Sequence, residues 1–170
     1  MKSLIRQTIF IYTIVSALLV CLAISSNGQS PKLLREFEIS VATSPFQRVF
    51  LNKSELTIWK RARIAKDKDS MLFKIELEPT DTLKLIKLLS EINLDSLKSY
   101  YQNRCVDDGF QFNIILKKGT DVKNIILANY YQEDIGRIIY FINSIVPNKY
   151  NIWYDKKTLI RDYKKCINRY

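Results

Sequence analysis

The stretch that decides the fold of this chain is Phe110-Gln111-Phe112-Asn113-Ile114-Ile115-Leu116-Lys117. Large apolar residues occupy every second position, which places Phe110, Phe112, Ile114 and Leu116 on one face of a β-strand. The next residues, Lys118-Gly119-Thr120-Asp121, are typical of a turn, and a second β-rich run follows from residue 123 to residue 131. The pattern therefore predicts a hairpin with one apolar face.

The spacing of apolar residues changes after Asp134, and the new period is that of an α-helix. Positions three and four residues apart form one stripe between residues 133 and 146, and Pro147 then ends the helix. The members of the stripe are Ile135, Ile138, Ile139, Ile142, Ile145 and Val146. A helix with one apolar stripe directly after such a hairpin predicts a ββα unit packed on itself.

A similar succession precedes this unit. Alternating apolar residues predict strands over residues 35–41 and 71–78. Between them, residues 48–51 and 56–61 are candidates for two more strands, with a turn at residues 52–55. Thr80 or Asp81 is the expected cap of a helix over 81–92. Its predicted buried stripe is Leu85, Leu88, Leu89 and Ile92. Residues 94–101 leave room for another helical turn or two, and 102–108 are expected to form a loop.

The C-terminal residues predict one more helix, capped by Asp155. Its apolar stripe is Leu159, Ile160, Tyr163, Cys166, Ile167 and Tyr170, and basic residues occupy most of the remaining positions. Such a helix either docks its stripe on the domain or lies on a membrane surface. The whole pattern predicts an α+β fold with two ββα-like units and an antiparallel sheet of about four to six strands. We expect helices 81–92 and 133–146 on one face and the last helix at an edge or end.

The N-terminal residues have the layout of a secretory signal peptide. A short basic start with Lys2 and Arg6 precedes an apolar run, and small residues follow before Gln29. This layout resembles the export signals of Gram-negative envelope proteins. We expect residues 1–28 to be removed and 29–170 to form a single exported α+β domain, periplasmic or extracellular. The alternatives are an uncleaved N-terminal membrane anchor and a lipidation site at Cys21.

The charge of the chain narrows the class of partner. Removing Lys2 and Arg6 leaves 25 basic residues against 17 acidic ones, a net charge of +8. Inside a cell that charge would favour nucleic acid, but export makes nucleic acid an unexpected partner. The anions outside the inner membrane are lipid headgroups, acidic glycans and acidic protein surfaces. The alternative is that the charge only keeps the protein in solution.

The sequence carries little of the usual apparatus of catalysis. It has no histidine, and its four glycines are isolated from one another, so we expect no histidine-based catalytic residues and no glycine-rich phosphate loop. We expect no metal ion and no cofactor either. The paired carboxylates are explained by a turn, a helix start and an outward strand face; they are Asp107 with Asp108, Glu133 with Asp134, and Glu76 with Glu78. A carboxylate-dependent hydrolase is the third reading of the sequence, and an oxygen-ligated calcium site is the other alternative for these carboxylates.

Candidate binding residues are cations and aromatic rings. One basic group follows the third predicted strand and contains Lys60, Arg61, Arg63, Lys66 and Lys68. A second lies on the C-terminal helix and contains Lys157, Arg161 and Lys164. The aromatic candidates are Tyr130, Tyr131 and Trp153, because exposed rings beside cations are typical of protein-binding and glycan-binding surfaces. The alternatives are a solvated charged loop and rings that only cover the ends of the sheet.

These observations favour a non-enzymatic exported module that binds another protein, and an inhibitor or immunity-type role would suit its size. The alternative is an envelope module that recognises acidic glycan or lipid through the basic groups. An exposed apolar patch would favour a protein partner, whereas strong salt dependence would favour a contact made by charges.

Two cysteines, Cys105 and Cys166, remain after the predicted cleavage. An even number of cysteines in an oxidising compartment predicts a disulfide between them, which would fix the last helix to the body of the domain. The alternative is that both are small buried apolar residues in separate places.

Overall fold

A computed structural model describes residues 37–43, 47–62, 68–106 and 108–168. The predicted signal peptide at residues 1–28 and the lipidation alternative at Cys21 lie outside this part. The chain divides into two units, Met1–Leu33 and Leu34–Tyr170, and the fold described below belongs to the second.

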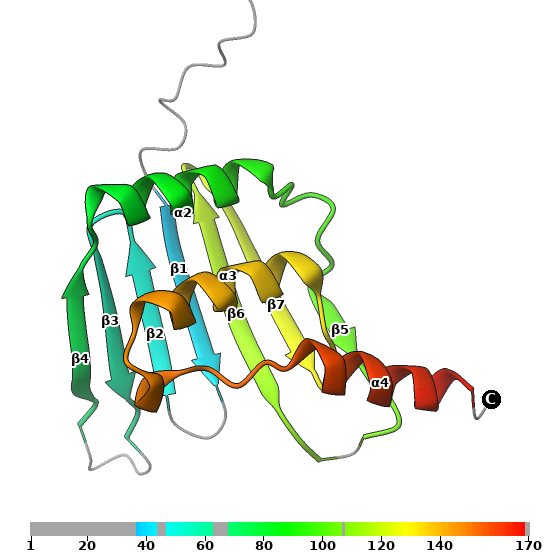
Figure 1. Cartoon of the computed structure of the whole chain (residues 1–170). Coiled ribbons are helices and arrows are strands. Elements are labelled where there is room, and N and C mark those ends of the chain that lie inside the picture. The colour runs from blue at the N-terminus through cyan, green and yellow to red at the C-terminus, as the bar shows by residue number, and fades with distance from the viewer. Residues whose placement is uncertain (1–36, 44–46, 63–67, 107, 169–170) are drawn as a thin grey trace, which may run out of the picture. The chain divides into compact units, whose positions relative to one another are not determined.

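The fold is α+β, with one seven-stranded sheet (Figure 1). In chain order the strands are β1 Phe37–Thr43, β2 Gln47–Asn52, β3 Glu55–Lys60, β4 Ser70–Glu76, β5 Tyr100–Gln102, β6 Gln111–Lys118 and β7 Asp121–Ala128. Their order in the sheet is β4-β3-β2-β1-β6-β7-β5, and only the pairing of β5 with β7 is parallel. The predicted fold class is confirmed, with one strand more than expected.

The additional strand is β5. Residues 94–101 were expected to extend a helix, but Tyr100–Gln102 pair instead with Ile126, Leu127 and Ala128 of β7. A three-residue strand is too short to show a period of two, and its partner follows it in the chain. The prediction was wrong here because the pairing depends on the tertiary structure.

The core lies between the sheet and two helices, α2 Pro79–Glu91 and α3 Glu133–Ile145, which cover one face (Figure 1). One row of paired side chains runs across most of that face: Phe73, Ile58, Val49, Val41, Ile114 and Ile125. All but Phe73, which is half-buried on the edge strand, are fully buried. The hairpin β6–β7 with α3 and the hairpin β3–β4 with α2 confirm the two ββα-like units.

The two helices start differently. Gln132 caps α3 by accepting a hydrogen bond from the Ile135 N–H at 2.8 Å. The cap of α2 is Glu78, and neither Thr80 nor Asp81 has that role. The prediction missed this because Pro79 was taken as the end of a strand, whereas proline suits the first helical position, where no N–H is needed.

The last helix, α4 Lys156–Ile167, is fixed at the β5 edge of the sheet. The Asp155 side chain caps it by accepting from the Thr158 N–H at 2.7 Å, as predicted. Leu159 and Cys166 are its buried residues. A disulfide joins Cys166 to Cys105, three residues beyond β5, with Cα atoms 5.5 Å apart, and this confirms the predicted bridge. Ile167 is 55% exposed although it was assigned to the buried stripe.

Candidate functional site

The face of the sheet opposite α2 and α3 carries no helix in the described part of the chain. The side chains that point to it alternate with the core residues along each strand. Cross-strand pairing sets them in a row: Met71, Trp59, Arg48, Ala42, Asn113, Ile126 and Tyr100. This uncovered face therefore offers large apolar and aromatic groups to solvent.

On β2, β3 and β4, five residues of this face form what we call the outer patch: Arg48, Phe50, Trp59, Met71 and Leu72. A shift of register between Ile58 and Trp59 pairs Trp59 with Met71 and leaves Leu72 opposite no residue. Met71 and Leu72 are 52% and 41% exposed. The outer patch is thus built by three consecutive strands and a bulge.

Two contacts hold the rings of the outer patch in place. The indole N–H of Trp59 donates to Thr57 Oγ1 at 3.1 Å, so the ring lies along its own strand. The guanidinium carbon of Arg48 lies 5.6 Å from the centre of the Phe50 ring, which is a cation–π arrangement. Ordered rings lose little entropy on binding, and this suits them to a protein interface.

The first predicted basic group borders the outer patch. Lys60 and Arg61 follow Trp59 directly, Lys68 precedes β4, and all three side chains are exposed. The Ala62 N–H donates to Asp69 Oδ1 at 2.8 Å and links the two arms of this hairpin. Arg63 and Lys66 lie outside the described residues. The cations therefore lie at one end of an apolar surface that the sequence pattern alone did not predict.

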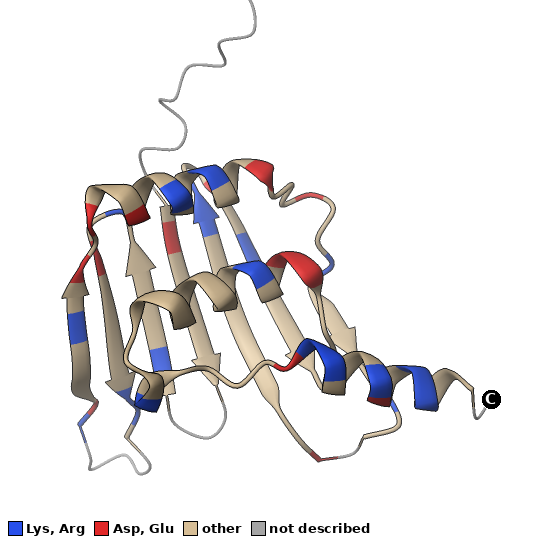
Figure 2. Ribbon diagram, in the orientation of Figure 1, with Lys and Arg blue, Asp and Glu red and all other residues tan. Residues whose placement is uncertain are grey.

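The second basic group lies at the other edge of the sheet (Figure 2). Five strand spacings separate β3 from β5, which is roughly 24 Å. On α4, Arg161 donates to Asp162 at 3.1 Å, and Lys157 and Lys164 are exposed. The structure does not bring the two predicted basic groups together, so a single small anion cannot contact both.

The two predicted tyrosine candidates contact rings of β5, of α4 and of the segment that precedes α4. Tyr130 packs between Tyr101 and Tyr163, at ring distances of 5.3 and 4.9 Å. Tyr131 stacks on Tyr154 at 5.1 Å. Together these rings join the segment before α4 to β5 and β7.

The remaining candidate, Trp153, stacks on Phe110 at 4.2 Å. Phe110 was expected to point into the core, but it precedes β6 and is 44% exposed. Trp153 is itself 43% exposed.

Tyr154 is the most buried polar group in this aromatic cluster. Its hydroxyl accepts a hydrogen bond from the Gln132 N–H at 2.8 Å and donates to the Tyr130 carbonyl at 3.0 Å. Burial raises the pKa of Tyr154 far above its ordinary value. A hydroxyl that is buried and bonded on both sides is a structural group.

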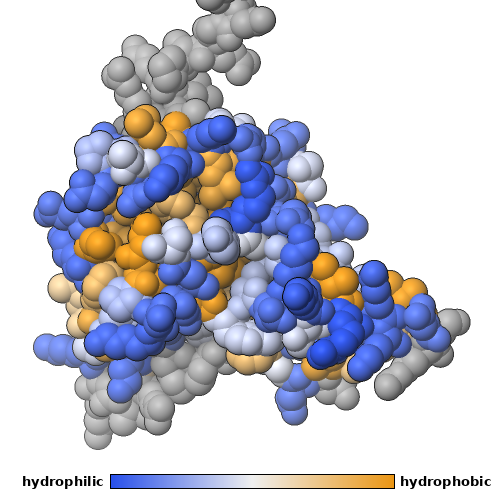
Figure 3. Space-filling view, viewed as in Figure 1, coloured by the Kyte–Doolittle hydropathy of each residue, from blue (hydrophilic) through white to orange (hydrophobic). Residues whose placement is uncertain are grey.

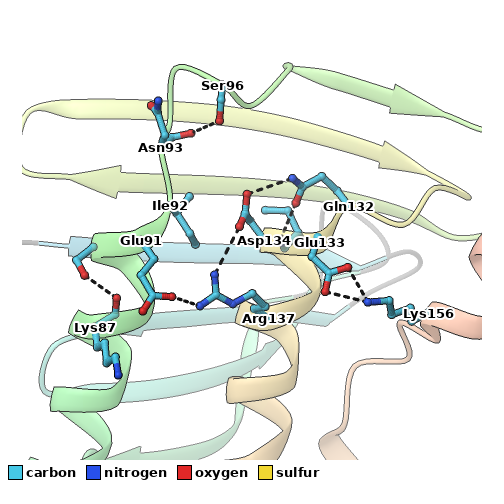
Figure 4. A network of polar contacts seen from close by, with 12 residues as sticks. Lys87, Glu91, Ile92, Asn93, Ser96, Gln132, Glu133, Asp134, Arg137 and Lys156 are labelled. Atoms are coloured by element: carbon cyan, nitrogen blue, oxygen red, sulfur yellow. Dashed lines mark hydrogen bonds and ion pairs between the residues drawn. The ribbon is translucent and has the colours of Figure 1, made fainter.

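The acidic pair at the start of α3 is neutralised by cations (Figure 4). Glu133 binds Lys156 of α4 at 2.7 Å, and Arg137 contacts both Glu91 of α2 and Asp134, the latter at 3.8 Å. The hydrogen bond to Glu133 also raises the pKa of Lys156. These ion pairs tie three helices together. Within the described residues, no group of three or more Cys, Asp or Glu side chains is placed to hold a metal ion.

The helix-covered face has a surface of its own. Apolar side chains are visible between α2 and α3 (Figure 3). An open depression of about 720 Å³ extends along α3, and its lining includes Leu88 of α2, Tyr140 of α3 and Lys156 of α4. The Tyr140 ring is 78% exposed. This depression is the second surface to which a partner could bind.

No protein-family model matches the chain, and no curated protein matches its sequence. None of the helices in the described ranges has the length and apolar character needed to cross a membrane.

Proposed function

We propose that this protein is an exported, non-enzymatic module that binds another protein through the outer patch. The observation that carries the proposal is the composition of the patch, in which Trp59, Phe50 and Arg48 lie side by side on an uncovered sheet face. Tryptophan and arginine are enriched among the residues that contribute most to protein–protein affinity. The open face of a sheet suits a second protein surface better than a small ligand, which needs a concave site.

The charges at the border of the outer patch indicate what kind of surface the partner should have. Lys60, Arg61 and Lys68 lie at one end of it, so the partner should combine an apolar centre with acidic residues on that side. The disulfide supports export, because such bonds persist in oxidising compartments. An inhibitor or immunity-type role is consistent with this surface.

The proposal is tested by capturing the partner and measuring its affinity for variants. A photoactivatable crosslinker at position 113, on the same face and two strands from Arg48, should capture a protein partner from cells, and the purified partner is then titrated. Trp59→Ala should weaken binding by about 2 kcal/mol or more, which is roughly thirtyfold. Tyr140→Ala is the matched control, because it removes an exposed ring on the opposite face.

Two results would contradict the proposal. If Tyr140→Ala weakens binding and Trp59→Ala does not, the partner binds the helix-covered face. The second result is a bound acidic glycan or lipid whose affinity falls steeply as the ionic strength rises. If Trp59→Ala does not change that affinity, the contact is made by charges alone.

A further inference from the structure

The two edges of the sheet are protected to different degrees. At one edge, β5 has three residues and is followed by Cys105, to which α4 is bound. At the other edge, β4 has seven residues and no strand beside it in the described part of the chain. An exposed edge strand presents unpaired N–H and C=O groups that can pair with another chain.

The free backbone groups of β4 can be identified. The Leu77 N–H donates to Ser54 O at 2.8 Å, so the groups of Leu77, Ile75 and Phe73 point toward β3. The backbone N–H and C=O groups of the intervening residues point away from β3, because these groups point to alternate sides along a strand. The Tyr150 hydroxyl confirms this direction, since it donates to the carbonyl of Leu72 from outside the sheet at 2.9 Å. Lys74 and Glu76 thus present their backbone groups to solvent.

The charges on this edge are incompletely matched. Glu76 pairs directly opposite Glu55 in the sheet, and like charges in that position are unfavourable. Lys74 binds Glu55 at 2.7 Å, and the hydrogen bond between them raises the pKa of Lys74. Glu76 has no ion pair within the described residues.

We propose that β4 pairs antiparallel with β4 of a second copy of this chain, with Ile75 opposite Ile75 of the second copy. This register sets Lys74 of each copy opposite Glu76 of the other, and these are the residues whose backbone groups are free. Two opposite-charge pairs form, and each Glu76 gains a cation. The neighbouring register sets the two Lys74 residues opposite each other, which repulsion disfavours.

The other face of the joint is apolar. Phe73, Ile75 and Leu77 lie on the core side of the edge and are only partly buried. The same register sets Phe73 of one copy opposite Leu77 of the other, so these side chains continue the core across the joint. A lysine in an edge strand ordinarily discourages pairing with another strand. In this dimer, Glu76 of the second copy lies opposite Lys74 and neutralises its charge.

The test is the oligomeric state of the protein, purified as cells produce it, by analytical ultracentrifugation over a range of concentrations. Lys74→Glu should raise the dimer dissociation constant by about tenfold or more, because two attractive pairs become repulsive. The exchange Lys74→Glu with Glu76→Lys should restore the dimer. Lys74→Pro removes one outward N–H and should also weaken it. Lys117→Glu, the same charge change on the interior strand β6, is the control and should leave the dimer unchanged.

Circular dichroism establishes that each variant is folded. A wild-type protein that stays monomeric up to its solubility limit overturns the proposal, as does a dimer that Lys74→Pro leaves unchanged. A folded exchange variant that does not regain the dimer overturns the register. Trp59→Ala should leave the dimer intact, so this proposal and the proposed partner-binding function can fail separately.

Discussion

Gly136 is the residue on which the joint between α3 and the C-terminal segment depends. A Cβ at this position would overlap the Tyr131 ring, with Cζ of that ring only 2.6 Å away. The Tyr131 ring itself stacks on Tyr154 and lies under the Lys156 ammonium at 5.3 Å. The glycine is therefore required by close packing rather than by backbone conformation.

Gly136→Ala should destabilise the protein by about 1 kcal/mol in chemical denaturation. The overlap costs about 1–3 kcal/mol, and the higher helix propensity of alanine offsets about 1 kcal/mol of that. In the Tyr131→Ala background the overlap is absent, so the same substitution should stabilise α3 by up to about 1 kcal/mol. A destabilising effect of equal size in both backgrounds would show that the ring is not the cause.

At the scale of the element, α4 depends on the disulfide more than on its own packing. Only Leu159 and Cys166 of this helix are buried. Replacing Cys105 and Cys166 together with serine should lower the free energy of unfolding by about 2–5 kcal/mol. Hydrogen exchange should show the loss of protection chiefly in α4, with α3 as the internal control. Equal loss in both helices would mean that α4 does not detach locally.

The cap of α4 makes that helix sensitive to acid. Hydrogen bonds from Thr158 lower the pKa of Asp155 below its ordinary value of 3.8. Because the pKa of Asp155 is lower in the folded protein than in the unfolded chain, its carboxylate stabilises the fold at any pH above the unfolded-state pKa. This stabilisation is lost as the pH falls through the folded-state pKa. The difference in melting temperature between wild type and Asp155→Ala should therefore be constant above about pH 5 and shrink below about pH 4. A difference that persists to the lowest pH would contradict the carboxylate cap.

The elements that sequence reasoning predicted best are those whose signal is local. The period of two in β6 and the stripe in α3 lie within their own segments, and both elements were predicted within a few residues. β5 was missed because it forms a strand only by pairing with β7, which comes later in the sequence. The outer patch was missed for a related reason. Alternation shows that Arg48 and Trp59 point away from the core, but only the register places them side by side, and only the tertiary fold shows that the described helices lie away from their face.

At the scale of the whole molecule, the separation of the two basic groups allows each to be tested alone. Reversing Lys60 and Arg61 together, to glutamate, should slow association with the protein partner several-fold at low ionic strength, and the effect should fade at high salt. Reversing Lys157 and Lys164 is the matched control, because it makes the same change in charge at the opposite edge. Equal slowing by both pairs would point to net charge rather than to the border of the outer patch.

The central position of β1 determines the order in which the sheet can assemble. β1 pairs on one side with β2, which follows it directly, and on the other with β6, which lies in the second half of the chain. Until β6 has been synthesised, the first four strands carry an open edge along Phe37–Thr43. β5 in turn is made before β7, with which it pairs. Pairings between distant segments form slowly, so we expect the joining of β1 to β6 to be the slowest step of folding. A chain cut short before residue 111 lacks β6 and should leave the edge of β1 exposed.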